Sequence, residues 1–582
     1  MIKGCEIIYK KLVKNKIKDV WIYSGGAIMP LIDCFNNQKK INYYINTTEQ
    51  NLGHSATGYA RSLNKPGICI VTSGPGLTNL ITPMLDAQND HTPLIVFSGQ
   101  VPLNAMGTQS FQEAPSVEIT KAFTKWSYCV KETSELNDVV DEAFEISMSG
   151  KKGVVHIDLP KCILTNEIED FEINETIYNE ELLDLLNTNK LEEISNIINN
   201  SERPLLCVGK GCNEGYLELK DLVENGNIPI TTTLHGVGCY DENKDLSLKF
   251  MGMHGSYSAN NAIQNSDCII ALGTRFDDRI IGNKNNYAPK AKKAYNEKRG
   301  GIIHCNIDNN TFNSVIKTNY NINLDCKNFL KQLLPYIKYK KRTKWLNEIN
   351  IWKKESGFIY EPVYNKLYSQ DVLIELNKLI ISMKKTQNKD YMFTTGVGNH
   401  QMFAAQFINF DKPNTLITSG SMGVMGFGLP AAIGVAIGNP DKDIIDIDGD
   451  GSFLMTLSDL KTAKQYNLKN LKILILNNKT LGMVDIWEKL FYDNRITATD
   501  NSSCPDFHKV AKSFGLKNLV CNNKKNLSKI LYKFLNTEGP ILAEIQVEHT
   551  PCYPLVAPGK SLDEMILWNT KNIIIDKTLP PS

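Results

Sequence analysis

Short apolar runs rich in β-branched residues recur along the whole chain and end at glycines or polar turns. The runs are apolar at nearly every position, so they predict strands that are buried on both faces of a sheet. Helical stretches separate them, and this alternation favours parallel sheets covered by helices. The runs are Gly67–Thr72, Pro93–Phe97, Val154–Leu159, Pro204–Val208, Cys268–Leu272, Ile302–Ile307, Asp443–Ile447, Leu471–Leu476 and Ile541–Val547.

The strand runs fall into three groups, so we expect an α/β fold of three consecutive parallel-sheet domains. Two polar stretches, Asn174–Asn189 and Tyr336–Lys354, separate the groups. The second stretch carries a basic run, which indicates either an anionic partner or a solvated linker helix, and we favour the helix. That run comprises Lys338, Lys340, Lys341, Arg342 and Lys344. The expected divisions are 1–175, 190–335, a linker at 336–364, 365–560 and a C-terminal tail at 561–582.

Composition narrows the class of protein. The 582 residues carry a formal net charge of +1, and 42% are hydrophobic, as in ordinary globular proteins. This charge gives no reason to expect nucleic acid or an anionic membrane as partner, and the longest apolar stretch, Leu429–Gly438, is too short to span a bilayer. The N-terminus shows no signal or transit peptide, so we expect a protein that is not secreted and that resides in the cytoplasm, or in the plastid stroma if plastid-encoded. The fourteen cysteines are scattered and are expected to be reduced thiols.

Two polar motifs follow neighbouring strand runs. The first is DGDGSF at residues 448–453, and the second begins at Asn477 and Asn478. Because strand ends of a parallel sheet meet at one edge, Asp450 and Asn478 are expected to lie together, and their oxygens suit Mg²⁺. Gly449 and Gly451 allow the backbone to approach phosphate groups, and the following helix N-terminus favours their charge. A lone GDG is also a common turn, but the pair of motifs with this spacing favours a site.

These motifs resemble the signature of thiamine-diphosphate enzymes. Glu49 lies in TTEQNLGHSATGYAR. An acid at this place is commonly only a partner of the helix dipole. In the family, a glutamate in this setting hydrogen-bonds N1′ of the aminopyrimidine and promotes deprotonation of the thiazolium C2. Met425 lies in GSMGVMGFGLPAAIG. It is either a core residue or, as in the family, the apolar wedge that bends the cofactor.

Further segments resemble one branch of that family, the acetolactate (acetohydroxyacid) synthases. They are SGGAIMPL, TSGPGLTN, GTQSFQEAP, TKWSY, GTRFDDR and LGMVDIWEKLFY, and they occur in this order along most of the chain. The resemblance implies a catalytic subunit that decarboxylates pyruvate and ligates the two-carbon unit to pyruvate or 2-ketobutyrate. This reaction is the first common step of valine, leucine and isoleucine biosynthesis. The implied cofactors are thiamine diphosphate, Mg²⁺ and an FAD without a net redox role.

The resemblance also implies roles for individual residues. The N-terminal domain would bind the pyrimidine, the central domain FAD, and the C-terminal domain the diphosphate and Mg²⁺. Catalytic roles fall to Glu49, Gln112 and Lys161. Thiamine diphosphate would be bound by Glu49, Val397, Gly398, Asn399, His400, Gly423, Met425, Asp450, Gly451, Ser452 and Asn478. The metal ligands would be Asp450, Asn478 and Thr480, and Met483, Val484 and Trp487 would line the substrate site. FAD would contact Phe111, Lys151, Gly209, Gly211, Thr233, Leu234, Met253, His254, Gly273, Arg275 and Asp308.

The chain departs from the family pattern at three positions. Asn399 stands where the synthases usually have Gln, Lys151 where they have Arg, and Ile486 where they often have Gln. Arg and Lys are not equivalent at stacked or bidentate sites. The implied partners are a second copy of the chain, in a homodimer or tetramer, and a small regulatory subunit, with no nucleic acid and no membrane.

Three alternatives are less favoured. A flavin-using pyruvate oxidase would leave Trp487 and the FDDR segment unexplained. Glyoxylate carboligase lacks the glutamate found here at position 49. A catalytically silent scaffold would be expected to have lost Glu49 or the metal ligands Asp450 and Asn478, and all three are present. In the synthases the tryptophan of the G-M-V-x-x-W motif favours 2-ketobutyrate as acceptor, and the simplest alternative for Trp487 is a core aromatic.

Overall fold

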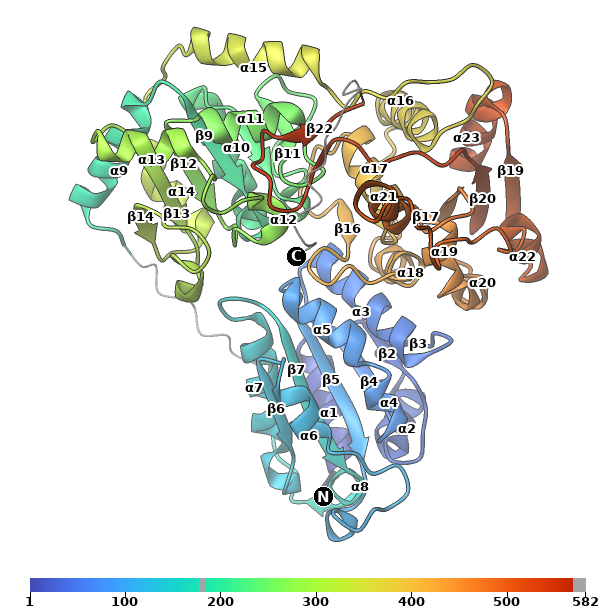
Figure 1. Ribbon diagram of the computed structural model, residues 1–582. Helices are drawn as coiled ribbons and strands as arrows, with labels where there is room; N and C mark the ends of the chain where they lie inside the picture. Colours follow the sequence, from blue (N-terminus) through green and yellow to red (C-terminus); the bar gives the residue numbers. More distant parts are fainter. Residues whose placement is uncertain (177–184, 569–582) are drawn as a thin grey trace.

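Three six-stranded parallel sheets form the core of the protein (Figure 1). The computed structural model describes residues 1–176 and 185–568. We call the three parts the N-terminal, middle and C-terminal blocks. In Figure 1 the N-terminal block lies below the other two, which lie side by side above it. The expected α/β fold of three parallel-sheet domains is confirmed. The polar stretch Asn174–Asn189 lies partly outside the described residues.

The strand runs seen in the sequence form the centres of these sheets. The N-terminal sheet has the order β3-β2-β4-β5-β7-β6, the middle sheet β11-β10-β9-β12-β13-β14, and the C-terminal sheet β16-β15-β17-β18-β20-β19. The N-terminal strands are β2 (Asp19–Ile22), β3 (Asn42–Tyr44), β4 (Gly67–Val71), β5 (Leu94–Gln100), β6 (Trp126–Cys129) and β7 (Val154–Pro160). The middle strands are β9 (Pro204–Val208), β10 (Ile230–Thr232), β11 (Ser247–Phe250), β12 (Cys268–Leu272), β13 (Gly301–Cys305) and β14 (Tyr320–Ile322). The C-terminal strands are β15 (Tyr391–Thr395), β16 (Leu416–Thr418), β17 (Asp443–Gly449), β18 (Leu471–Asn477), β19 (Lys517–Cys521) and β20 (Ile541–Gln546).

Helices cover both faces of each sheet, as parallel strands with apolar residues on both faces require. Those that matter most for the site are α3 (Glu49–Leu63), α5 (Ile81–Asn89), α17 (Asn399–Phe407), α18 (Gly428–Gly438), α19 (Asp450–Leu454) and α21 (Gly482–Phe491). The other long helices are α1 (Gly4–Lys14), α2 (Met29–Gln38), α7 (Leu136–Met148), α9 (Thr188–Asn200), α10 (Tyr216–Gly226), α11 (Tyr257–Asn265), α13 (Pro289–Asn296), α14 (Cys326–Leu333), α15 (Thr343–Glu355), α16 (Ser369–Gln387) and α23 (Leu527–Asn536).

Each sheet has a point where the strand order reverses, and ligands of open α/β sheets bind at that point. In the C-terminal sheet it lies between β15 and β17, and in the middle sheet between β9 and β12. In the N-terminal sheet it lies between β2 and β4. The motifs singled out from the sequence follow these strands, so the topology places them where ligands bind.

Helices α3 and α18 join the N-terminal and C-terminal blocks. A Cβ atom at Gly58 would lie 2.3 Å from the carbonyl oxygen of Ala431, and one at Gly434 would lie 1.8 Å from that of Ser55. The Ser55 hydroxyl donates to the carbonyl of Pro430 at 2.7 Å. The apolar stretch 429–438 is therefore a buried helix of the block contact, where glycines let the two backbones approach closely.

The basic run is only partly solvated, because Lys338, Lys341 and Lys344 are exposed but Arg342 is buried. Helix α15 begins within the run and carries Lys344, and Trp345 on that helix is buried. Arg342 is 3% exposed and donates to the carbonyls of Ser201 and Ile198 at 3.2 and 3.0 Å. It thereby neutralises the C-terminal end of α9, where unpaired carbonyls favour a cation.

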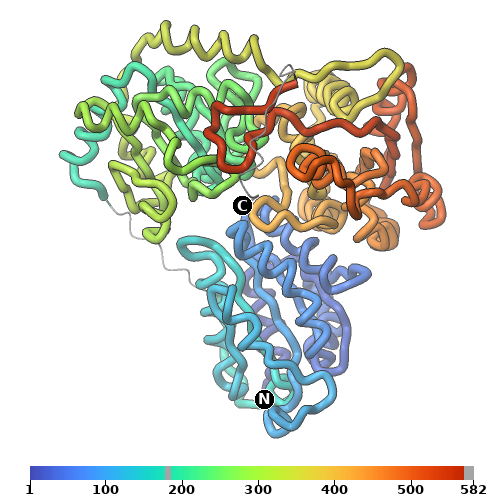
Figure 2. The backbone as a smooth tube through the Cα atoms, in the orientation of Figure 1, coloured from blue at the N-terminus to red at the C-terminus, as the bar shows by residue number. Residues whose placement is uncertain are grey.

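The C-terminal part of the described chain returns to the middle block (Figure 2). The two short strands β21 (Leu555–Val556) and β22 (Met565–Ile566) pair antiparallel over this block, and Leu562 between them is buried in its core. The Val556 N–H donates to the carbonyl of Met253 at 2.8 Å. This return fixes the segment that carries Met253 and His254.

Two further findings concern the cysteines and the possibility of a membrane-spanning helix. All fourteen cysteines carry free thiols. Within residues 1–176 and 185–568, no helix is both long enough and apolar enough to span a bilayer.

Candidate active site

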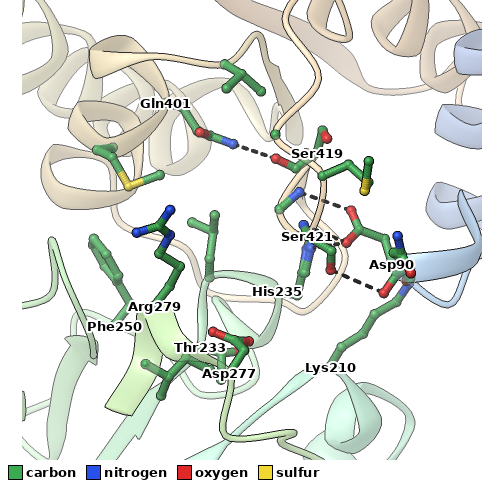
Figure 3. A pocket seen from close by; sticks show the side chains of 18 of the residues that line it. Asp90, Lys210, Thr233, His235, Phe250, Asp277, Arg279, Gln401, Ser419 and Ser421 are labelled. Carbon is green, nitrogen blue, oxygen red and sulfur yellow. Dashed lines mark hydrogen bonds and ion pairs between the residues drawn. The ribbon is translucent and has the colours of Figure 1, made fainter. Parts of the chain in front are cut away.

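One cavity of about 1340 Å³ runs between the middle and C-terminal blocks and reaches α3 and α5 of the N-terminal block (Figure 3). It exceeds the roughly 300–1,000 Å³ of a site for a single small ligand. Nearly all residues proposed from the sequence for thiamine diphosphate, metal, substrate and flavin line it. Four do not, and they are Glu49, Phe111, Gln112 and Lys161.

The metal candidates meet at the carboxyl ends of β17 and β18. Asp450 is 1% exposed, and one carboxylate oxygen accepts the N–H of Asn478 at 3.4 Å. Burial raises the pKa of Asp450. The amide oxygen of Asn478 accepts the N–H of Thr480 at 3.1 Å and keeps a second lone pair for a cation. One carboxylate and one amide oxygen at this edge fit Mg²⁺, which takes its remaining ligands from phosphates and water.

Asn501 completes this corner. Its side-chain amide donates to the second oxygen of Asp450 at 2.6 Å. The sequence analysis missed Asn501 because it follows no strand and belongs to no motif. It holds the carboxylate in one orientation, as the neighbours of metal ligands commonly do.

The diphosphate candidates lie at the reversal point of the same sheet. Ser452 accepts the N–H groups of Val397 and Gly426 at 3.3 and 2.9 Å, so its hydroxyl connects three segments. The amide oxygen of Asn399 and Nε2 of His400 are buried without a hydrogen bond, although Nε2 lies 3.3 Å from Asp448. Buried polar atoms without partners are rare, and here they fit a polar ligand at the reversal point. The shorter side chain of Asn399 donates at 3.3 Å to the carbonyl of Thr550.

The glycines around Met425 permit the tight loop that carries it. Gly423 and Gly426 have φ values of +63° and +85°, which glycine adopts without strain. A Cβ atom at Gly426 would lie 2.9 Å from Thr456. Met425 lines the cavity, and its methyl carbon would lie 3.6 Å from a Cβ atom at Gly451, as expected of a cofactor-facing residue.

The flavin candidates surround the reversal point of the middle sheet. A Cβ atom at Gly209 would lie 2.3 Å from the carbonyl oxygen of Gly273, so the loops after β9 and β12 touch through their glycines. Lys151 of the N-terminal block lies 3.0 Å from Asp308 after β13. Burial raises the pKa of Asp308, but the Lys151 ammonium and the Asn310 N–H outweigh burial and keep it below its usual value. An acidic residue after a strand is typical of ribose recognition in such folds, so the residues fit a dinucleotide.

His254 lies on the wall shared by the two blocks. Its Nδ1 is 3.1 Å from the carbonyl of Cys552, and burial lowers its pKa to about 4. The imidazole is therefore neutral at physiological pH and acts as a fixed polar group of the cavity wall.

Glu49 and its neighbours form a second edge, away from the cavity. Glu49 is buried at the start of α3, where Thr48 caps the helix by accepting the N–H of Asn51. The Asn79 amide donates to the Glu49 carboxylate at 3.0 Å. Gln112 has a φ of +61°, and its carbonyl oxygen would lie 2.8 Å from a Cβ atom at Gly74. The loop with Gln112 therefore packs on the turn that precedes Asn79.

The remaining two N-terminal candidates are open to solvent. Phe111 is 88% exposed, and Lys161 is exposed at the start of the short helix α8 (Lys161–Thr165). An aromatic side chain left this open has no packing role within the chain, so it is free to contact another molecule.

The acceptor candidates lie on α21. Trp487 packs edge-to-face on Phe491 with ring centroids 5.2 Å apart, and Met483 and Val484 line the same part of the cavity. Ile486 is buried in the core of the C-terminal block and does not line the cavity. The sequence also missed Asp485, whose carboxylate lies 2.5 Å from Nε2 of His549 and ties α21 to the segment after β20.

Comparison with known proteins agrees with these motifs. Three models of thiamine pyrophosphate enzymes match the chain: the N-terminal TPP binding domain at residues 2–119, the central domain at 191–333 and the C-terminal TPP binding domain at 396–545. The mitochondrial acetolactate synthase catalytic subunit of Saccharomyces cerevisiae is 41% identical over 580 residues, which covers 97% of this chain and 84% of that protein. The mitochondrial acetolactate synthase of Schizosaccharomyces pombe is also 41% identical, over 97% of this chain and 86% of its own. The acetolactate synthase large subunit of Cyanidium caldarium is 36% identical, over 97% and 96%.

Proposed function

The chain belongs to the acetolactate synthase family of thiamine-diphosphate enzymes, and from this membership we propose how its residues carry the reaction. It is a thiamine-diphosphate-dependent carboligase of branched-chain amino acid biosynthesis. The reaction joins two 2-keto acids with loss of one CO₂. The observation that carries the assignment of residues is the position of the DGDG motif at the reversal point of the C-terminal sheet, with the NN motif after the neighbouring strand β18.

Bound thiamine diphosphate supplies the carbanion chemistry, and the chain orients it and places protons. We propose that Asp450 and Asn478 hold Mg²⁺ against the diphosphate, with Thr480 as a further ligand. Ser452, His400 and the glycines at 398 and 451 would then contact the phosphate oxygens. Met425 would press on the cofactor from the side of its loop. Glu49 would exchange a proton with the aminopyrimidine, and Gln112 and Lys161 would contact the substrate.

The middle block is proposed to bind FAD in a structural role. The contacts between Gly209 and Gly273, together with the cations Lys151 and Arg275 on the cavity wall, support a dinucleotide there. The exposed Phe111 supports a contact with a neighbouring subunit, because the cavity of its own chain does not include it. For the same reason we propose that Glu49 serves the cavity of a partner copy, in a homodimer or tetramer.

The relatives' names bear on partners and location. Two of them are named as catalytic or large subunits, which supports a separate regulatory subunit for this chain. Relatives are named as mitochondrial or chloroplastic, so residence in the cytoplasm or plastid stroma stays a prediction.

The test of the function is an assay of the purified full chain. With thiamine diphosphate, Mg²⁺, FAD and pyruvate, we expect acetolactate and CO₂ in a ratio near one to one, because two pyruvates lose one carboxylate. The flavin absorbance should stay that of the oxidised form. Bleaching of the flavin by pyruvate without acetolactate would instead favour an oxidase.

Acceptor choice is expected to depend on Trp487. The two acceptors differ by one methylene, so only apolar packing can distinguish them, and its loss is worth about 1–2 kcal/mol, or roughly 5–30-fold. We expect Trp487→Leu to shift product formation from 2-aceto-2-hydroxybutyrate toward acetolactate by this factor. The measurement is the product ratio in a competition between pyruvate and 2-ketobutyrate.

Phe491→Leu is the matched control. It removes the edge-to-face partner of Trp487, but Phe491 does not line the cavity, so the ratio should stay near that of the unmodified chain. Equal ratios for Trp487→Leu and the unmodified chain would make Trp487 a packing residue, and Met483 would become the next candidate.

A further inference from the structure

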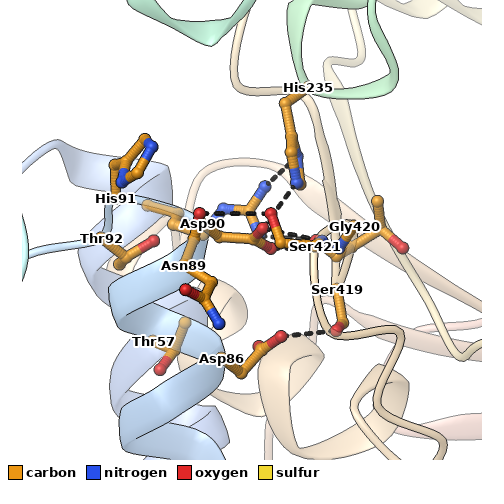
Figure 4. Close-up of polar contacts among 12 residues, drawn as sticks. Thr57, Asp86, Asn89, Asp90, His91, Thr92, His235, Ser419, Gly420 and Ser421 are labelled. Atoms are coloured by element: carbon orange, nitrogen blue, oxygen red, sulfur yellow. Dashed lines mark hydrogen bonds and ion pairs between the residues drawn. The ribbon is translucent and has the colours of Figure 1, made fainter. Parts of the chain in front are cut away.

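The C-terminal end of α5 is a junction of all three blocks (Figure 4). Asp90 ends this helix, and its carboxylate is fully buried. One carboxylate oxygen accepts the N–H of Gly420 at 3.0 Å, and the other accepts the N–H of Ser421 at 2.9 Å. A side chain of the N-terminal block thus holds the backbone of a loop of the C-terminal block.

Two further side chains, His235 and Arg61, lie close to the Asp90 carboxylate. Nε2 of His235, from the middle block, lies 3.0 Å from the oxygen that accepts from Ser421, and Arg61 lies 3.4 Å from the other oxygen. Arg61 also donates to the carbonyl of Thr418 at 2.6 Å and lies 2.8 Å from Nδ1 of His235. Because arginine only donates, Nδ1 accepts, and the proton of the imidazole sits on Nε2 facing Asp90.

Asp90 is ionised in this setting. Burial by itself raises its pKa, but His235, Arg61 and the hydrogen bond from Ser421 outweigh burial and bring the pKa well below its usual value. An ionised carboxylate only accepts hydrogen bonds, and this one accepts three, from the N–H groups of Gly420 and Ser421 and from Arg61. Nε2 of His235 lies beside them, 3.0 Å from one carboxylate oxygen.

The same end of α5 is fixed by the middle block. Lys210 is half-buried and donates to the carbonyls of Asp90 and His91, where a helix C-terminus favours a cation. Arg275 donates to the carbonyl of Asn89 at 3.0 Å and to the hydroxyl of Ser421 at 2.8 Å. The helix end therefore has a set position when it meets the loop.

The loop held by Asp90, residues 419–427 between β16 and α18, carries Met425. Its start, Gly420, lies flat on the His235 ring, because a Cβ atom there would be 2.2 Å from Nε2. The Ser419 hydroxyl accepts the N–H of Val424 at 2.9 Å and so ties the start of the loop to its middle. Its end is fixed by the Gly426 N–H, which donates to Ser452. Met425 thus lies between an anchor in its own block and one supplied by Asp90.

We propose that Asp90 is a positioning residue that sets the Met425 loop from the N-terminal block and couples it, through His235, to the flavin side of the cavity. Asp90 acts through the backbone N–H groups of Gly420 and Ser421 and does not contact substrate. The inference rests on the proposed function, since that function assigns Met425 to the cofactor.

Asp90→Asn tests the proposal with an isosteric change. In either orientation, the new NH₂ group faces the backbone N–H of Gly420 or of Ser421, so one of the two hydrogen bonds to the loop is lost. We expect kcat at saturating cofactors to fall about 10–100-fold while the KM for pyruvate changes less than about 3-fold, because a displaced loop misaligns a bound cofactor. Deuterium exchange at C2 of the bound thiazolium should slow by a similar factor, and this readout needs no substrate.

Asp86→Asn is the matched control, one turn earlier on α5. The Asp86 carboxylate accepts the Ser419 hydroxyl at 2.5 Å through one oxygen, and its other oxygen has no partner. An asparagine keeps the acceptor and places its NH₂ at the unpaired position, so exchange at C2 should stay within about 2-fold. Affinities for FAD and thiamine diphosphate, measured by fluorescence titration, separate loss of position from loss of binding.

Gly420→Ala is a second route to the same displacement. Its methyl group collides with His235 while all charges remain, so it should slow C2 exchange as Asp90→Asn does. Normal C2 exchange in Asp90→Asn, or in Gly420→Ala if the first variant does not fold, would overturn the proposal. An equal effect of Asp86→Asn would also overturn it. Absence of acetolactate from the unmodified enzyme would instead count against the proposed function.

Discussion

Glu49→Gln is expected to lower acetolactate formation by about 10²–10⁴-fold, the range of a lost proton-transfer group. Glutamine has nearly the same volume and can still accept the hydrogen bond that Asn79 donates at 3.0 Å. It cannot give up or take up a proton at the position of the carboxylic acid. Folding and cofactor affinity should therefore change little, and the loss should appear in kcat. The measurement is steady-state turnover at saturating thiamine diphosphate, Mg²⁺ and FAD.

The alternative is that Glu49 only stabilises the start of α3. Three features argue against this alternative. Thr48 already caps the helix, the Glu49 carboxylate accepts a hydrogen bond from Asn79, and the Glu49 side chain is buried. Glu6→Gln is the matched control, because Glu6 lies in the first turn of α1 and accepts the N–H of Lys3 at 2.9 Å. If both variants kept normal turnover, Glu49 would be a helix-end residue like Glu6.

The strands could be predicted because their signal is local. Pro204–Val208 and Cys268–Leu272 are apolar throughout, and they form β9 and β12 residue for residue. Strand ends also carry the motifs, so the meeting of Asp450 with Asn478 followed from the pattern of a parallel sheet.

The residues that sequence missed are those whose partners are set by packing between distant segments. Asn501 reaches Asp450 only after the chain has passed through α21. Asp90 meets Gly420 across two blocks, and nothing near Asp90 in the sequence indicates that a loop will arrive there. The burial of Arg342 could not be predicted for the same reason. A run of cations is expected to be solvated, and only the folded chain brings the C-terminal end of α9 against Arg342.

Asp450→Ala is expected to remove the Mg²⁺-dependent part of cofactor binding. A divalent ion loses its one carboxylate, and since even residues behind the metal ligands contribute 10–100-fold, the loss should reach at least about 100-fold. Thiamine diphosphate titrations with and without Mg²⁺ measure it. Asn501→Ala removes only the group that orients Asp450, so it should cost about 10-fold. Equal affinities with and without Mg²⁺ in the unmodified chain would contradict the metal site.

A mixture of the Glu49→Gln and Asp450→Ala variants tests whether each site is shared between two copies of the chain. Glu49 lies outside the cavity that Asp450 lines, so in a symmetric dimer each cavity would take Glu49 from one chain and Asp450 from the other. A mixed dimer of the two inactive variants then contains one site with both defects and one with neither. After verified subunit exchange of equal amounts, activity should return to about a quarter of that of the unmodified enzyme, because half of the dimers are mixed and each has one working site. Recovery of no activity would mean that Glu49 and Asp450 serve the same chain, and that the N-terminal edge must close onto its own cavity.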